Sequence, residues 1–146
     1  MQTGALAGAS ALPLWVPRGY AQSALNALPR VALIIGNTKY VEAPLKNPAN
    51  DAKAIAGELA KTNFKVNLLL DASRNQMAEA IASFSAELAK SKAVGMFYYA
   101  GHGAQLAWRN YLIPVDAVIE KLDDMRTKTI ELNSLLEGMK IGRAHV

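Results

Sequence analysis

His102 is the residue of this 146-residue chain whose type and setting best suit proton-transfer chemistry. It stands between Gly101 and Gly103, just after the apolar run at residues 94–99. An imidazole has an unperturbed pKa of about 6.5, so it can accept or give a proton near neutral pH. The glycines permit sharp backbone turns and close approach of another chain, so that a nearby backbone N–H can point at a substrate. A loop histidine in a turn that only needs glycines would explain the same pattern.

Carboxylates are the other candidates for chemistry. Asp51 falls in the first turn of a predicted helix, where a carboxylate interacts favourably with the helix dipole, and that structural role is sufficient to explain it. Asp71 and Asp116 are explained equally well as turn or cap residues. Gly36 and Asn37, which follow the first predicted strand, are not continued by the glycine-rich sequence of a phosphate-binding loop.

The composition excludes several kinds of site. The chain contains no cysteine, which rules out disulfides, thiolate metal sites and a thiol nucleophile within these residues. Two histidines leave almost nothing for a zinc site, and no cofactor is expected, although a calcium requirement is not readable from the sequence. The net charge is +4 with scattered lysines, so nucleic-acid binding is not expected. A hydrophobic content of 51% fits one globular domain.

Three apolar runs and two amphipathic segments must position His102. Residues 30–35, 66–70 and 94–99 are predicted to be buried strands, because each is short, apolar and followed by a turn or loop signal. Asn47 and Pro48 predict the N-cap and first position of a helix. Its apolar face carries residues at helical spacing, namely Ala52, Ile55, Ala56 and Leu59.

A second helix is predicted to begin at a capping box formed by Ser73 and Gln76. Its apolar stripe comprises Met77, Ala80, Ile81, Phe84 and Leu88. Alternating strands and helices indicate a parallel sheet with right-handed crossovers and helices on its faces. His102 then lies past the carboxyl end of a strand, where open α/β sheets bind ligands. Farther on, residues 111–114 are predicted to be extended, and Asn133 to cap a helix containing Leu135 and Leu136.

Four segments together resemble the caspase-like cysteine peptidase superfamily, especially bacterial caspase-homologous peptidases, metacaspases and paracaspases. They are RVALIIGN at 30–37, LKNPANDA at 45–52, FYYAGHG at 97–103 and NYLIPVDA at 110–117. The resemblance extends from about residue 30 to residue 139. It implies an α/β fold of the caspase-like three-layer type, with a mostly parallel sheet and helices on both faces, truncated at the C-terminal end.

The resemblance also implies roles for three residues. In this family the residue matching His102 assists a cysteine and handles the proton delivered to the leaving amine. The backbone N–H of the residue matching Gly103 helps to form the oxyanion hole. Asp51 resembles the acidic residue that helps paracaspases to bind a basic P1 side chain, so cleavage after Arg or Lys is expected. True caspases instead use a basic pocket and prefer aspartate.

The sequence departs from the family in lacking the nucleophile. Caspase-type sequences place the cysteine about 50 residues after the histidine, which corresponds to about position 152 here. Truncation would produce this absence, and the polypeptide as written is expected to be inactive. Two alternatives stay open: a catalytically inactive caspase-like interaction or scaffold domain, and an unrelated α/β ligand-binding domain.

The two ends of the chain are predicted to lie outside the domain. Residues 1–21 resemble an incomplete export signal of a bacterial protein, with 22–29 as a linker and 30–140 as the N-terminal part of the caspase-like domain. Residues 141–146 can be encoded by a string resembling a sequencing adapter, so His145 receives no role. We therefore expect a periplasmic or extracellular protein, or a cytoplasmic one without the signal, that acts on polypeptides and has no membrane span.

Overall fold

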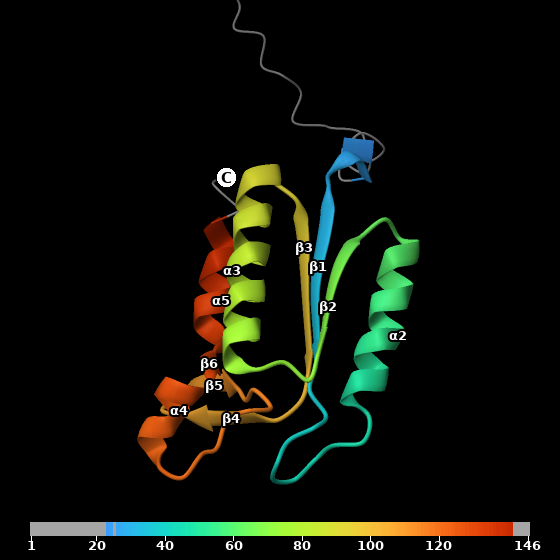
Figure 1. Cartoon of the computed structure of the whole chain (residues 1–146). Helices are drawn as coiled ribbons and strands as arrows, with labels where there is room; N and C mark the ends of the chain where they lie inside the picture. Colours follow the sequence, from blue (N-terminus) through green and yellow to red (C-terminus); the bar gives the residue numbers. More distant parts are fainter. Residues whose placement is uncertain (1–22, 25, 142–146) are drawn as a thin grey trace, which may run out of the picture.

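The computed structural model describes residues 23–24 and 26–141 of the chain. The predicted export signal at 1–21 lies outside the described residues, as does the predicted read-through segment apart from residue 141. Figure 1 labels the elements, which follow one another as β1 (Arg30–Gly36), α2 (Pro48–Lys61), β2 (Lys65–Leu70), α3 (Arg74–Ser91), β3 (Val94–Ala100), β4 (Gly103–Leu106), β5 (Arg109–Leu112), α4 (Leu122–Lys128), β6 (Ile130–Glu131) and α5 (Leu132–Ile141).

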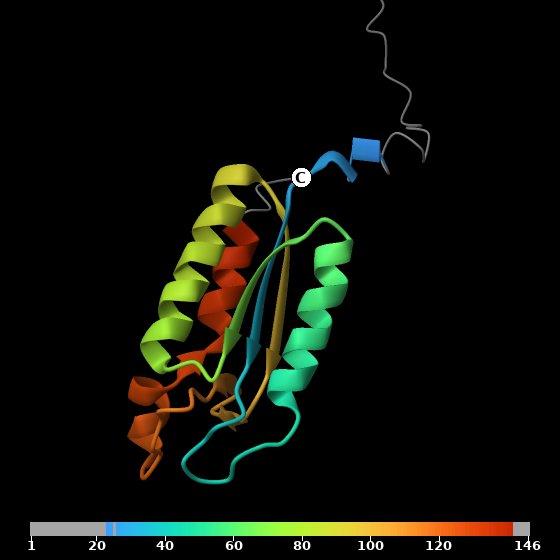
Figure 2. The same cartoon turned by 45° about the vertical axis from the view of Figure 1, so that its right-hand side comes forward.

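The three long strands form a parallel sheet in the order β2-β1-β3. Figures 1 and 2 show α2 on one face of this sheet, with α3 and α5 on the other. The predicted α/β fold with helices on both faces of a parallel sheet is therefore confirmed. All three strands end at the same edge, and β4, β5, β6 and α4 gather there (Figure 1).

The central strand β1 contributes to two hydrophobic clusters because alternate side chains point to opposite faces of a sheet. Ala32 and Ile34 pack with Ala52 and Ala56 of α2. On the other face, β1 packs against α3 and α5 through Val31, Leu33, Ile35, Met77, Phe84 and Leu135. Burying one large aliphatic side chain contributes about 1.5–3 kcal/mol, so these clusters fix β1 and hence the position of its carboxyl end.

The two long helices begin in different ways. The predicted capping box of α3 is confirmed: Gln76 N–H donates to Ser73 Oγ at 3.2 Å, and Ser73 N–H donates to Gln76 Oε1 at 2.9 Å. Asn47 is the N-cap residue of α2 and Pro48 begins the helix, as predicted, but the Asn47 side chain makes no capping hydrogen bond. Thr38 Oγ1 instead accepts from Ala49 N–H at 3.0 Å, so a residue distant in the sequence satisfies this helix end.

A small antiparallel sheet, in the order β4-β5-β6, follows β3. The extended segment predicted at 111–114 is in fact β5, which ends at Leu112, and its partner strands were not predicted. The prediction that Asn133 caps the last helix is wrong because β6 runs directly into α5, which begins at Leu132. Leu135 is buried as expected for the inner face of this helix, whereas Leu136 is exposed.

The loop after β1 is tied to the neighbouring strand ends. Asn37 is fully buried, donates its N–H to Ala100 O at 2.8 Å and accepts from Ala72 N–H at 2.9 Å. Asp71 Oδ1 accepts from Thr38 N–H at 2.8 Å and from Lys39 N–H at 2.9 Å. The expected turn role of Asp71 is thus confirmed, and these contacts fix the path of the chain toward Tyr40.

Candidate functional site

Two tyrosine hydroxyls hold both backbone polar groups of His102. His102 N–H donates to Tyr40 Oη at 2.9 Å, and Tyr99 Oη donates toward His102 O at 2.8 Å. The two hydroxyl oxygens lie 3.2 Å apart, and both contact Ile113 O, Tyr40 at 2.9 Å and Tyr99 at 3.0 Å. We call Tyr40 and Tyr99 the tyrosine pair; together they fix the backbone from which the imidazole projects.

The imidazole itself is held from a different loop. His102 Nε2 lies 2.7 Å from Ala43 O, and the Tyr40 and His102 ring centroids are 4.4 Å apart with a 54° interplanar angle. Because a carbonyl oxygen only accepts, Nε2 must carry the proton in this contact, which leaves Nδ1 as the atom able to exchange one. Ala43 has a left-handed backbone with φ of 51°, which is uncommon for a non-glycine residue.

Tyr99 of the tyrosine pair is held in its neutral form. Burial raises the pKa of the Tyr99 phenol far above its ordinary value, and its hydrogen bond with Tyr40 acts in the same direction. Tyr99 therefore stays neutral wherever an imidazole titrates. Sequence reasoning missed Tyr40, Tyr99 and the Ala43 carbonyl. Tyr99 lies in the same segment as His102, whereas Tyr40 and Ala43 lie about sixty residues away and carry no local signal.

The two glycines beside His102 bear out one of the two predicted reasons, close approach of another part of the chain, but not the sharp turn. No glycine in the described part of the chain has a positive φ, so a sharp left-handed turn is not the reason for either. A Cβ on Gly101 would lie 2.6 Å from both Tyr40 Oη and Tyr99 Oη, so Gly101 admits the tyrosine pair. A Cβ on Gly103 would meet only Tyr111 O at an ordinary 3.5 Å, so the fold itself leaves room there.

The N–H of Gly103 points away from its partner strand. Ile113 N–H donates to His102 O at 3.0 Å, and the antiparallel register continues with Gly103 opposite Leu112. Bonded and non-bonded pairs alternate in an antiparallel ladder, so Gly103 and Leu112 form a non-hydrogen-bonded pair. A hollow of about 350 Å³ lies beside Gly103, and residues of both β4 and β5 line it. The Gly103 N–H is therefore directed to the outer side of β4.

Asp51 lies in the first turn of α2, whose N-terminus is at the same edge of the sheet as His102. The residue is exposed, and its backbone N–H donates to Asn47 O at 3.0 Å. Within the described residues, no hydrogen bond or ion pair joins its carboxylate to His102 or Gly103. The structure thus brings His102 and Gly103 together, and leaves Asp51 near the same edge with its carboxylate accessible.

A hollow of about 220 Å³ lies beside the imidazole and is called the His102 hollow below. Residues from the loop after β1, from the segment before α4 and from just after β3 line it, among them Tyr40, Val41, Ala43, Val118, Ile119 and His102. The part of the hollow formed by Val118 is held in place by α4, because Lys128 Nζ of this helix donates to Val118 O at 3.0 Å. Asp124 Oδ2 accepts from Glu120 N–H at 2.9 Å and Lys121 N–H at 3.2 Å.

The hydrogen bonds to Asp124 have an electrostatic consequence. The backbone N–H of Glu120 is the main cause that holds the pKa of the Asp124 carboxyl below its ordinary value, and Lys128 Nζ at 3.3 Å from Oδ1 adds to it. Asp124 therefore stays ionised over the range in which an imidazole titrates. Asp116, expected to be a turn or cap residue, accepts from Arg74 N–H at 2.9 Å at the start of α3.

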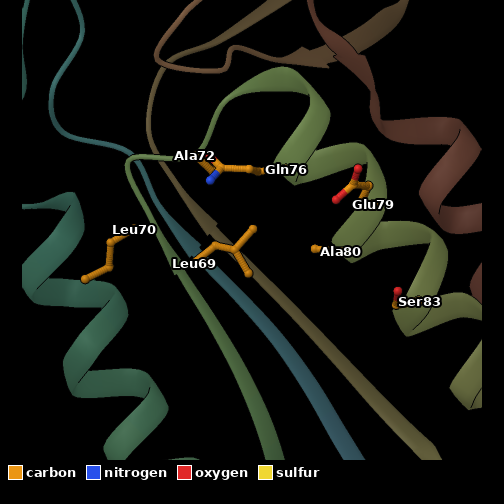
Figure 3. A pocket seen from close by; sticks show the side chains of 7 residues that line it. All are labelled: Leu69, Leu70, Ala72, Gln76, Glu79, Ala80 and Ser83. Atoms are coloured by element: carbon orange, nitrogen blue, oxygen red, sulfur yellow. The ribbon is translucent and has the colours of Figure 1, made fainter.

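A second hollow, of about 270 Å³, lies between β2 and α3 and is called the β2–α3 hollow. Figure 3 shows Leu69 on β2 facing Glu79, Ala80 and Ser83 on α3. It shares no lining residue with the His102 hollow and contains no histidine. Its only ionisable lining residue is Glu79, so it offers no pair of groups for proton transfer.

In the part of the chain that the structure describes, no cluster of three or more histidine, cysteine or acidic side chains is placed to hold a metal ion. No helix within the same residues combines the length and apolar character needed to cross a bilayer.

The sequence of the chain matches a protein family and two curated proteins. Residues 29–140 match the family model described as "Caspase domain". Over 89 residues the chain is 40% identical to the mucosa-associated lymphoid tissue lymphoma translocation protein 1 homolog of Mus musculus, and equally to its Homo sapiens counterpart. Each match covers 60% of this chain and 11% of the relative, so the chain spans about a tenth of the length of these curated relatives. Both are mammalian; bacterial origin and export remain predictions.

Proposed function

The chain belongs to the caspase domain family, which is a family of proteases. We propose that it is the histidine-bearing part of a cysteine endopeptidase domain. The observation that carries the proposal is the double fixation of His102, by the tyrosine pair at its backbone and by Ala43 O at its ring. A loop histidine without a function would not need both. Its substrates are polypeptides.

His102 acts as the proton carrier in this proposal. A cysteine thiolate attacks the scissile carbonyl carbon, and the C–N bond breaks as His102 Nδ1 gives its proton to the leaving amine nitrogen. Water then hydrolyses the thioester, with the neutral imidazole accepting a proton from it. The Ala43 carbonyl stabilises the imidazolium that precedes amine departure and the one that forms during thioester hydrolysis, because it accepts from Nε2–H in both protonation states.

Gly103 supplies an N–H donor to the oxyanion of the tetrahedral intermediate. Its N–H is directed away from β5, and the absence of a side chain leaves the approach open. One such donor contributes about 10²–10³ to kcat in well-studied acyl-transfer enzymes. The tyrosine pair serves as positioning residues, since both hydroxyls act through the backbone of His102.

The nucleophile has to come from outside these 146 residues, which contain no cysteine. Within the described residues, β3 pairs with β1 on one side and with no strand on the other. Its side chains, including Phe97 and Tyr99, are only half-buried. A further parallel strand added at this edge would end beside His102, because the carboxyl ends of parallel strands share one edge of a sheet.

Asp51 is the proposed determinant of specificity for a basic P1 side chain. Its carboxylate is accessible at the edge where His102 lies, and a carboxylate binds a guanidinium through charge-assisted hydrogen bonds. The same carboxylate also interacts favourably with the α2 dipole, and the two roles are compatible.

The alternative function is a caspase-like domain that binds partners without cleaving them, and the lack of cysteine in the sequence is the observation that favours it. The test is cleavage of quenched peptides by the intact protein that contains these residues, with Arg, Lys, Ala or Asp at P1. Cleavage after Arg and Lys is expected. A protein that carries no cysteine near the predicted position and cuts none of the peptides would be the inactive domain.

A further inference from the structure

The His102 hollow exposes apolar side chains next to the residue that donates the proton. Val41 is 84% exposed, Val118 45% and Ile119 36%, and all three line this one hollow. Its volume of about 220 Å³ falls below the range of about 300–1,000 Å³ typical of small-molecule pockets. The space therefore suits one side chain of a longer ligand rather than a complete small molecule.

The chemistry of the proposed reaction says which side chain that is. The leaving nitrogen must come within about 2.6–3.2 Å of the imidazole to receive its proton. That nitrogen belongs to the residue directly after the scissile bond, and its side chain begins only two bonds farther along. The first side chain on the leaving side of a substrate is thus brought close to His102, which lines this hollow.

We propose that the His102 hollow is the subsite for the first residue after the scissile bond, and that it selects an apolar side chain there. This inference rests on the proposed function. Val118 and Ile119 form one wall and Val41 another, while Glu42 also lines the hollow and disfavours an acidic side chain. The Val118 wall is preorganised, because Lys128 and Asp124 hold the backbone from Val118 to Lys121.

The test uses the intact protein and three quenched peptides that share Arg at P1 and differ only in the next residue, which is Leu, Ser or Asp. We expect kcat/KM for the Leu peptide to exceed that for the Ser peptide about tenfold, with Asp lowest. The double variant Val118→Ser, Ile119→Ser should bring the Leu-to-Ser ratio of kcat/KM close to one.

Trp108→Ser is the matched control, since Trp108 is 93% exposed and lies outside the hollow; it should keep the preference for Leu. Equal cleavage of the three peptides by the wild type, or a preference for Leu that survives in the double variant, would overturn the inference. If no peptide is cleaved, the proposed function fails instead. Binding of the same peptides, followed by fluorescence anisotropy, then decides: a preference for Leu lost in the double variant supports the subsite, and equal binding overturns it.

Discussion

The His102 hollow and the β2–α3 hollow are similar in volume, at about 220 and 270 Å³, but differ in what surrounds them. The first has an imidazole fixed at its backbone and at its ring, exposed apolar walls and a donor N–H on the adjacent residue. The second is a groove at the sheet edge, with Glu79 as its only ionisable lining residue (Figure 3). Concavity alone therefore does not mark a site here; convergent polar groups do.

The largest effect is expected when the imidazole is removed from the first hollow. His102→Ala should lower kcat/KM of the intact protein for an Arg peptide by at least about 10²-fold, because general acid–base catalysis contributes about 10²–10⁴. The measurement is initial-rate cleavage of a fluorogenic peptide. Ser83→Ala, a comparable truncation in the β2–α3 hollow, is the control. Equal losses in the two variants would remove the distinction between the hollows.

Removing the hydroxyls of the tyrosine pair should have the next largest effect. Tyr40→Phe together with Tyr99→Phe should lower kcat about tenfold with little change in KM, since the imidazole loses its fixed position while the substrate contacts remain. Each lost hydrogen bond should also cost about 1 kcal/mol of folding stability.

The control for the tyrosine pair is Tyr98→Phe, because Tyr98 neighbours Tyr99 on β3 but packs against the α2 cluster on the opposite face of the sheet. It should leave kcat unchanged. A purely structural role for the tyrosine pair predicts instead a lower melting temperature with an unchanged kcat.

A substitution at Asp51 tests whether the substrate-binding region extends to the start of α2. Asp51→Asn should lower kcat/KM for Arg peptides about fivefold relative to peptides with Ala at P1, because an exposed charge pair contributes on the order of 1 kcal/mol. The ratio of the two rates is the readout. A change shared equally by both peptides would assign Asp51 to the helix terminus alone.

The contribution of Asp124 to the wall of the His102 hollow can be tested by the pH dependence of folding stability. Its folded-state pKa is lowered, so the stability contributed by its carboxylate is fully present above the unfolded pKa and is lost as pH falls through the folded value. The wild type should therefore have a higher melting temperature than Asp124→Asn at neutral pH. The two melting temperatures should converge as the pH falls below the usual aspartate pKa of about 3.9. Parallel melting curves over that range would contradict this account of Asp124.

The β2–α3 hollow should give the smallest effect of all. Glu79→Ala should change kcat/KM for Arg peptides less than about twofold, because surface substitutions away from special features usually alter free energies by about 0.5 kcal/mol or less. Peptide cleavage at matched protein concentrations measures it. A loss approaching that of His102→Ala would show that the two hollows are not functionally distinct.

The sequence predicted the frame of the molecule well, because periodic apolar residues and the capping box at Ser73 and Gln76 are local signals. It failed where the partner of a group lies far along the chain. The Thr38 hydroxyl accepts from Ala49 N–H at the start of α2, and the Tyr40 hydroxyl accepts from His102 N–H across 62 residues. Short strands such as β6, with two residues, carry too little periodicity to be detected.

The candidate site was predicted in part for the same reason. His102 and Gly103 stand in a recognisable segment, so both were named from the sequence. The Ala43 carbonyl is a backbone group, which no residue type reveals, and its orientation depends on a left-handed φ of 51°. Close approach at Gly101 was predicted, but only the structure shows that two tyrosine hydroxyls are what approaches it, and the predicted sharp turn is wrong because neither glycine has a positive φ.

Covalent labelling of the intact protein tests most directly whether the His102 hollow belongs to a cysteine peptidase site. A peptide acyloxymethyl ketone ending in Arg alkylates an activated thiolate by displacing its carboxylate leaving group, and mass spectrometry locates the adduct. Our account predicts one adduct per chain, on a cysteine outside these 146 residues, with labelling strongly slowed by His102→Ala and unaffected by Glu79→Ala. No adduct, or an adduct formed equally fast in the His102→Ala protein, would contradict it.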